Sequence, residues 1–388
     1  MADRITKRLT QDVIVHILIR LAVKPLMRLK CVSKSCYTLI KSSTFLNLHI
    51  HRKTTSKDEL ILFKRSFKQN TGQYTTILSF LSGDDDDYLN SIFPDLDVTH
   101  LTSIHHYNND QLVGPCHGLI ALMDSHITIL FNPSTRIYKL LPPNPFGCQK
   151  GFFDSTEAVG FGFDSIANDY KVVRISIIYI VNDGYPDEHE RKVQIYNLSN
   201  DYWREIDHAG QQLTTFFIDQ CSQMFYKGTC HWIASQDIDA FLVLCFDMST
   251  EIFRSFKIPE TCHYSDGPCC RLVLLHDSLT LIYYPYPEPV IPLEKEMLNV
   301  WVMRDYSTYE SWIKKYTITG LPIETPLAVW KNCLLLFQNR SGCLMSYNLE
   351  SNEVKELNYH GYPQSLRVAV YKDSLASIPR ETEQVHKF

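Results

Sequence analysis

One phrase recurs along the chain and decides the fold: Phe131-Asn-Pro-Ser-Thr-Arg-Ile-Tyr-Lys-Leu-Leu141. It consists of an apolar run, an Asn or Asp, a turn rich in Ser and Thr, and a second short apolar run. The copies are Tyr196-Asn-Leu-Ser-Asn-Asp-Tyr-Trp-Arg-Glu-Ile206, Phe246-Asp-Met-Ser-Thr-Glu-Ile-Phe-Arg-Ser-Phe256 and Tyr347-Asn-Leu-Glu-Ser-Asn-Glu-Val-Lys-Glu-Leu357, with a looser one from Trp301 to Tyr316. Because the Asn or Asp side chain can accept hydrogen bonds from the turn backbone, each copy predicts a β-hairpin.

The spacing of the copies predicts the architecture. They begin at residues 131, 196, 246, about 301 and 347. A repeat of about fifty residues that is nearly all strand favours four-stranded blades arranged radially, because one blade cannot bury both of its faces alone. The strand-like runs at Leu60–Phe63 and Thr75–Leu81 supply a sixth blade. A β-sandwich, or a pair of stacked sheets, is the alternative.

The first fifty residues have helical periodicity instead. Val13, Ile14, Ile17, Leu18 and Leu21 form one stripe, with Thr10 as its N-cap and Asp12 in its first turn. Pro25 opens a second short helix through Leu29, and Ser33 caps a third that carries Cys36. Three short helices bury too little surface to be stable alone, so this unit should dock on a partner. A small helical cap on the following domain is the alternative.

We therefore expect an α+β chain that is mostly β. Residues 5–50 form a three-helix unit, residues 58–380 a kelch-like β-propeller of about six blades, and residues 381–388 a flexible tail. The chain has 388 residues, of which 45% are hydrophobic, and this composition excludes a disordered protein.

Several features indicate a protein of the reducing cytosol. No run reaches the roughly twenty apolar residues that a membrane helix needs, and the N-terminus lacks a signal peptide, so no membrane partner is expected. The twelve cysteines are scattered rather than spaced as a disulfide framework.

Charge divides the chain unevenly. Residues 1–57 carry twelve Lys and Arg against two Asp and Glu, a net of +10, so the remainder has a net charge of −15. The basic unit is typical of a solvated face or of a dock for an acidic protein. The acidic body argues against nucleic acid and favours a basic partner.

No motif for catalysis, a metal or a cofactor stands out. Gly160-Phe-Gly162 lacks the third glycine and the helix of a nucleotide fingerprint, and it predicts close strand packing or a tight turn. The neighbours Cys116-His117, Cys230-His231 and Cys262-His263 would point to opposite faces of a strand, so packed thiols are expected rather than zinc.

Two acidic segments and one loop are candidate substrate contacts. The first is Asp84, Asp85, Asp86 and Asp87. The second is the polar segment Asn182–Arg191, with Asp183, Asp187 and Glu188, placed between strands where binding loops usually lie. Asp266 lies in the third, a loop that crosses between blades. Solvated loops without a ligand are the alternative for the acidic segments.

The helical unit resembles a plant F-box. The resemblance rests on Leu9-Thr-Gln-Asp-Val-Ile-Val-His-Ile-Leu18, Arg20-Leu21, Val23-Lys24-Pro25-Leu26, Arg28-Leu-Lys-Cys-Val-Ser-Lys34 and Cys36-Tyr-Thr-Leu-Ile40. It implies an acidic Skp-like adaptor that bridges to a cullin. The residues it assigns to adaptor binding are Leu9, Thr10, Asp12, Val13, Ile17, Leu18, Leu21, Pro25, Leu26, Leu29, Cys31, Val32, Lys34 and Cys36. The family usually has Pro at position 10 and Trp at position 36, so Thr10 and Cys36 predict a weakened or specialised adaptor contact.

The rest of the chain resembles the F-box-associated domain, and more narrowly the S-locus F-box proteins of flowering plants. The phrases are Gly114-Pro-Cys-His-Gly-Leu-Ile120, Met224-Phe-Tyr-Lys-Gly228, Glu310-Ser-Trp-Ile-Lys-Lys-Tyr-Thr-Ile318 and Val159-Gly-Phe-Gly-Phe-Asp-Ser-Ile-Ala-Asn-Asp-Tyr-Lys-Val-Val-Arg-Ile175. The resemblance implies a non-catalytic receptor of a ubiquitin ligase in the pollen tube cytosol, with basic style S-ribonucleases as substrates. An F-box receptor for an unrelated plant substrate and an enzyme on a propeller scaffold are the alternatives.

Overall fold

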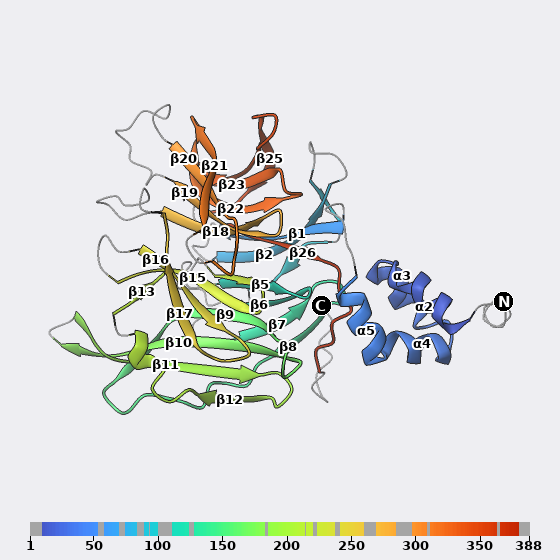
Figure 1. Cartoon of the computed structure of the whole chain (residues 1–388), viewed down its shortest axis with the longest axis horizontal. Coiled ribbons are helices and arrows are strands. Elements are labelled where there is room, and N and C mark those ends of the chain that lie inside the picture. The colour runs from blue at the N-terminus through green and yellow to red at the C-terminus, as the bar shows by residue number, and fades with distance from the viewer. Residues whose placement is uncertain are drawn as a thin grey trace.

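The computed structural model has a small helical unit beside a ring of six sheets (Figure 1). It describes residues 10–52, 58–69, 74–83, 89–92, 94–99, 111–123, 128–182, 185–213, 215–219, 223–236, 241–259, 269–284, 297–308, 311–362 and 365–379. The expected mostly-β fold with a propeller of six blades is confirmed. Within these residues, no helix is long and apolar enough to span a membrane.

The helical unit (residues 10–52) contains α2 (Gln11–Ile19), α3 (Val23–Leu29), α4 (Lys34–Lys41) and α5 (Ser43–Ile50). The three expected helices are present, and α5 is a fourth that the pattern did not reveal. Thr10 is the N-cap of α2 by position, but its side chain makes no capping hydrogen bond. The Oγ of Ser33 accepts a hydrogen bond from the backbone N–H of Cys36 at 3.1 Å, as expected. Helix α3 begins two residues before Pro25, which still lies in the first turn, where its missing N–H costs nothing.

Six sheets make the propeller. From the inner to the outer strand the first is β26 (Arg367–Lys372), β1 (Glu59–Lys68) and β2 (Tyr74–Ser82), with β3 (Asn90–Ser91) and β4 (Leu96–Asp97). The second is β5 (Gln111–Cys116), β6 (Leu119–Met123), β7 (Thr128–Asn132) and β8 (Ile137–Leu140). The third is β9 (Phe153–Asp164), β10 (Asp169–Asn182), β11 (Tyr185–Asn197) and β12 (Tyr202–Glu205), followed by the short 3-10 helix η3 (Gly210–Leu213).

The remaining three blades follow the same plan. The fourth is β13 (Phe217–Ile218) and β14 (Met224–Tyr226), both paired with β15 (Thr229–Ser235), then β16 (Phe241–Asp247) and β17 (Phe253–Lys257). The fifth is β18 (Cys269–Leu275), β19 (Ser278–Tyr284), β20 (Met297–Met303) and β21 (Trp312–Thr319). The sixth is β22 (Ile323–Trp330), β23 (Leu334–Asn339), β24 (Cys343–Asn348) and β25 (Val354–His360).

The first blade closes the ring by joining the two ends of the chain. Strand β26, near the C-terminus, pairs with β1, and Ile61 lies opposite Val370. The expected sixth blade at Leu60–Phe63 and Thr75–Leu81 is thus confirmed, with its inner strand supplied from the far end of the sequence. A sandwich of two stacked sheets is excluded by the six separate sheets.

The recurring phrase is the outer hairpin of a blade. Its copies fall on β7–β8, β11–β12, β16–β17, β20–β21 and β24–β25. The side-chain oxygens of Asn132, Asp247 and Asn348 each accept two backbone N–H groups of the turn, as predicted. In the third blade Asp169 performs this role instead, because its carboxylate accepts the backbone N–H of Ser199 at 2.9 Å.

The core lies between blades rather than inside any one of them. Six clusters of buried apolar side chains each join two neighbouring sheets. At the boundary of the third and fourth blades, a Cβ on Gly160 would lie 2.7 Å from Cζ2 of the buried Trp232. A Cβ on Gly162 would lie 2.4 Å from Cε2 of Phe225. The predicted close strand packing at these glycines is confirmed.

A C-terminal strap (residues 373–379) joins the helical unit to the propeller. Leu375 is buried in the core of the helices, while Ala376 and Ile378 are buried between the second and third blades. The side chain of Asn132 donates hydrogen bonds to the carbonyls of Ser374 and Ala376 at 3.1 and 2.9 Å. The strap therefore places the helices at the end of the propeller where β5 and β26 end, which we call the helix face (Figure 1).

Candidate functional site

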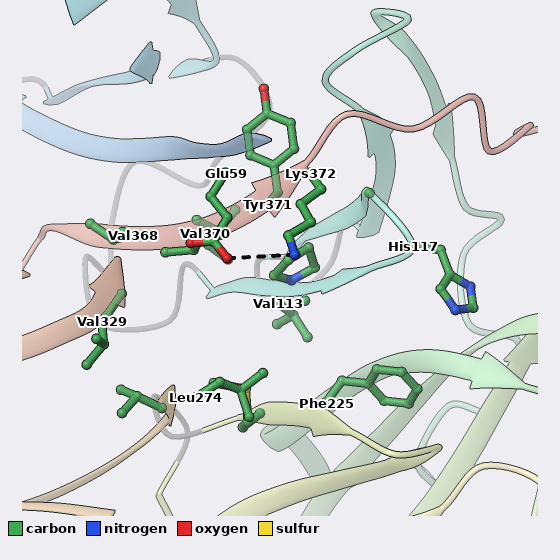
Figure 2. A pocket seen from close by; sticks show the side chains of 18 of the residues that line it. Glu59, Val113, His117, Phe225, Leu274, Val329, Val368, Val370, Tyr371 and Lys372 are labelled. Atoms are coloured by element: carbon green, nitrogen blue, oxygen red, sulfur yellow. Dashed lines mark ion pairs between the residues drawn. The ribbon is translucent and has the colours of Figure 1, made fainter. Parts of the chain in front are cut away.

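A cavity of about 640 Å³ lies where the inner strands of the blades meet. Its lining mixes aliphatic and polar side chains, and Figure 2 shows Val113, Leu274, Val329, Val368 and Val370 lining it from four different blades. Because each blade contributes only a few residues, no single stretch of sequence signals this cavity. Its size is within the range of small-ligand pockets.

Charged and aromatic groups share the lining with these aliphatic side chains. Lys372, at the end of β26, forms an ion pair with Glu59 at 3.7 Å (Figure 2). His117 packs against Phe163, with ring centroids 4.7 Å apart, and also contacts His51 of the helical unit. Burial, and then His51, lower the pKa of His117 to about 4, so its imidazole is neutral near pH 7. An enzyme on this scaffold predicts a central channel lined by convergent ionisable groups, and a channel filled by apolar side chains would remove that alternative. The lining contains charged and aliphatic residues together, so the enzyme alternative stays a prediction.

The helical unit presents an apolar surface to solvent. Val13 and Ile17 of α2 are 42% and 50% exposed, and Val32, between α3 and α4, is 54% exposed. Tyr37 of α4 is also exposed, and Lys41 lies 4.9 Å from the centre of its ring. Exposed large apolar side chains on a unit with a net positive charge are typical of a protein-docking surface. Tyr37 was not among the predicted contacts.

The predicted adaptor residues divide into three groups by burial. Leu18 and Leu26 are buried in the helical core, where they hold the helices together rather than contact a partner. Leu21, Leu29 and Cys36 are half-buried, and the other described members are exposed, namely Thr10, Asp12, Val13, Ile17, Pro25, Cys31, Val32 and Lys34. Leu9 lies outside the described residues.

An arm extends from the propeller on the side away from the helices (Figure 1). It is built from the first residues of β9, the last of β10 and the first of β11, because these strands run to twelve, fourteen and thirteen residues. Phe153 and Val181, both 51% exposed, lie on it, and Phe153 stacks on Tyr179 with centroids 5.8 Å apart. The arm therefore presents exposed apolar side chains on this opposite face.

The arm corrects one expectation. Asp187 and Glu188 were placed in a loop, but they lie in strand β11, paired with Ile180 and Tyr179 of β10. The acidic, turn-like composition of this segment predicts a loop. It forms a strand nevertheless, because pairing with the long, β-branched β10 outweighs its weak strand propensity. The other predicted substrate contacts, Asp84, Asp85, Asp86, Asp87, Asp183 and Asp266, lie outside the described residues.

A buried ion pair anchors the base of the arm. The guanidinium of Arg191 donates to both carboxylate oxygens of Glu157, at 2.7 and 3.0 Å, and to the carbonyl of Leu213 at 2.6 Å. Glu157 also accepts the backbone N–H of Ile218 at 3.2 Å. Farther out, Arg174 pairs with Asp154 at 2.9 Å. These contacts fix the arm to the segment that leads into the fourth blade.

The cysteine and histidine neighbours behave as packed groups. Cys116 and Cys230 are buried, and burial raises the pKa of both thiols. His231 is fully buried between the carbonyl of Met224 and the hydroxyl of Tyr306. The expectation of packed thiols is confirmed for these two cysteines, whereas Cys262-His263 lies outside the described residues.

Comparison with known proteins identifies both parts. Residues 7–48 match the F-box domain, and residues 77–378 match the F-box associated beta propeller domain. The chain therefore belongs to the family defined by the F-box associated beta propeller domain. It is an F-box protein with a propeller of the substrate-binding type, an organisation consistent with a substrate receptor of an SCF ubiquitin ligase.

Similar proteins occur in Arabidopsis thaliana. The chain is 25% identical to F-box protein CPR1 over 94% of this chain and 87% of that protein. It is 26% identical to F-box/kelch-repeat protein At3g23880 over 92% of this chain and 91% of that protein. Among solved structures, oligogalacturonate lyase from Vibrio parahaemolyticus shares 10% identity at a TM-score of 0.42, covering 78% of this chain and 79% of that one. A similarity of that size supports no functional statement.

Proposed function

We propose that this chain is the substrate receptor of an SCF ubiquitin ligase. The exposed surface of the helical unit binds a Skp-like adaptor, which bridges to a cullin. The face of the propeller opposite the helices, with the arm, binds the substrate. The chain performs no covalent chemistry, and its contribution is to hold substrate lysines near the enzyme that transfers ubiquitin.

The observation that carries this proposal is the placement of two exposed apolar features at opposite ends of the molecule. Val13, Ile17 and Val32 lie on the helical unit, and Phe153 and Val181 lie on the arm. The buried strap fixes the distance between them, since Leu375 is 3% exposed in the helical core and Ile378 is 3% exposed in the propeller core. A receptor needs such a fixed spacing to present its substrate.

We further propose that the substrate is a basic style S-ribonuclease met in the pollen tube cytosol. The net charge of −15 on residues 58–388 supports a basic ligand. Asp187 and Glu188, in strand β11 of the arm, are the acidic residues that we propose for this contact. The alternative is an unrelated plant substrate, and identities of 25–26% to the two Arabidopsis relatives allow this.

The adaptor contact is tested by co-purification of the full chain with a Skp-like adaptor and cullin. We expect the double variant Val13→Asp, Ile17→Asp to reduce adaptor affinity by a hundredfold or more, because buried charge replaces apolar contact. Ile166→Asp is the matched control, since Ile166 is an 81% exposed residue of the propeller. Equal recovery of adaptor with wild type and the double variant would overturn the proposal.

The substrate contact is tested with a panel of style ribonucleases at two salt concentrations. The full chain is required, because a fragment without the helices would expose Leu375. We expect binding that weakens as salt rises, and a tenfold or greater loss in the variant Asp187→Asn, Glu188→Gln. Absence of binding to every basic ribonuclease, with adaptor binding intact, would reject the S-ribonuclease and retain the receptor.

A further inference from the structure

Three side chains with metal-binding atoms meet on the outer hairpin of the sixth blade. They are Cys343 on β24 and Glu356 and His360 on β25. The thiol, one carboxylate oxygen and one imidazole nitrogen all lie within 4.8 Å of one another, and the Sγ of Cys343 is 3.0 Å from Nδ1 of His360. Glu356 and His360 are exposed and Cys343 is half-buried, so an ion can enter directly from solvent.

An irregular strand pairing creates this cluster. Met345 pairs with Glu356, but Cys343, two residues earlier, pairs with His360, which is four residues later. In a regular antiparallel ladder Cys343 would lie opposite Asn358. The bulge contains Asn358 at a φ of +55°, and it moves His360 opposite the thiol. Bulges of this kind redirect side chains and occur often beside functional sites.

The surrounding contacts hold the two strands without using the three side chains. Leu357 and Tyr359, which alternate with Glu356 and His360 along β25, pack against the first blade. The backbone N–H of Cys343 donates to the side chain of Asn339 at 2.9 Å, and that of Gly361 donates to the carbonyl of Gly342 at 3.1 Å. The three ligand atoms can therefore converge by side-chain rotation alone.

We propose that Cys343, Glu356 and His360 form a zinc site on the rim of the sixth blade. A thiolate and an imidazole prefer zinc to the oxygen-seeking ions magnesium and calcium, and a carboxylate is an accepted third ligand. Three protein ligands leave one tetrahedral position for water or for a donor atom of a bound protein. The site is independent of the proposed receptor function. No sequence motif indicates this site, because its ligands lie thirteen and four positions apart along the chain.

The test is titration of the metal-free full chain with Co²⁺, followed by displacement with Zn²⁺. We expect one equivalent of Co²⁺ to bind with the visible bands of a tetrahedral ion and a thiolate charge-transfer band, and Zn²⁺ to remove both. Cys343→Ser and His360→Gln should each weaken Zn²⁺ binding tenfold or more. Cys148→Ser, which removes a half-buried thiol outside this cluster, is the matched control and should bind Zn²⁺ as tightly as wild type.

A rescue variant separates loss of a ligand from damage to the hairpin. His360→Cys retains a ligand at the same position, so it should restore Zn²⁺ binding and strengthen the thiolate band. A titration without a thiolate band would overturn the proposal, because no cysteine would then bind the metal. Cys343→Ser that binds Co²⁺ as tightly as wild type and keeps the thiolate band would also overturn it and would locate the metal at another cysteine.

Discussion

At the scale of single residues, Asp164 shows how one side chain joins two blades. Its carboxylate accepts the backbone N–H of Ala167, forms a 2.6 Å ion pair with Lys171, and accepts the hydroxyl of Ser249 from the next blade. Burial acts to raise the pKa of Asp164, but these hydrogen bonds and the charge of Lys171 outweigh it and lower the pKa to about 2. The carboxylate is therefore charged and stabilising near pH 7.

We predict that Asp164→Asn destabilises the fold by about 2–4 kcal/mol at pH 7, since Lys171 loses a buried partner. Lys171 keeps its second partner Glu251, at 2.8 Å, which limits the loss. Because the folded pKa is lowered, the difference from wild type should shrink as pH falls from about 4 towards 2. Urea denaturation of wild type and variant across this pH range measures the difference in their free energies of unfolding. Asp154→Asn, at the half-exposed pair with Arg174, should cost under about 1 kcal/mol.

His231 leads to a second prediction about the pH dependence of stability. Here the fold disfavours the charged form of the side chain, whereas at Asp164 it favours the charged form. Burial is the main cause that lowers its pKa to about 4, so the folded chain holds this imidazole neutral while the unfolded chain protonates it near pH 6.5. Above pH 6.5 the imidazole is neutral in both states, so His231 does not change the free energy of unfolding. As the pH drops from 6.5 to about 4, protonation of the unfolded chain lowers that free energy by on the order of 3 kcal/mol. His231→Gln should flatten the urea midpoint between pH 6.5 and 4.5. An unchanged slope would contradict this assignment.

At the scale of elements, the sequence phrase Val159–Ile175 encodes the junction between the third and fourth blades. Its two glycines allow the fourth blade to approach, and its turn supplies Asp164. Lys171 reaches the next outer hairpin, donating to the carbonyl of Met248 at 2.8 Å. One continuous stretch therefore carries a structural interface, which explains why it is so distinctive as sequence.

We predict that Gly160→Ala destabilises the fold by about 1–3 kcal/mol through overpacking. The new Cβ would lie 2.7 Å from Trp232 and 2.8 Å from Val173, and both side chains are fully buried. Gly147→Ala is the matched control, because a Cβ there meets nothing within 4 Å. Thermal denaturation of both variants provides the comparison, and equal melting temperatures would contradict the packing seen here.

At the scale of the whole molecule, the segment near the C-terminus joins the propeller ring to the helical unit. Strand β26 closes the ring against β1, and the strap that follows enters the helical core. The helices and the propeller therefore share buried side chains and should unfold together.

We predict that Leu375→Asp uncouples the helical unit from the propeller, because a charge replaces a buried apolar side chain of the helical core. Calorimetry should resolve two transitions where wild type has one, and protease cleavage near residues 50–58 should accelerate. Val354→Asp, at a 44% exposed position, is the control. A single unchanged transition in Leu375→Asp would show that the strap does not couple the two parts.

Local chemistry made the blades and helices predictable. Alternating apolar residues, the Asn or Asp of each outer turn and the cap at Ser33 act over a few positions, so the pattern itself reports them. The helix α5 was missed because Ser42, its N-cap, follows α4 without a break. For the adaptor surface, periodicity identified the helices but could not separate the buried Leu18 from the exposed Ile17.

The sequence by itself determined that this chain is a small helical unit followed by repeated four-stranded blades. Only the tertiary structure decided that β26 completes the first blade, that Asp187 and Glu188 lie on a strand, and that Cys343 faces His360. It also decided which residues line the central cavity. The physical reason is that hydrogen-bond register and burial between distant segments depend on which strands meet, and short-range patterns do not contain this information.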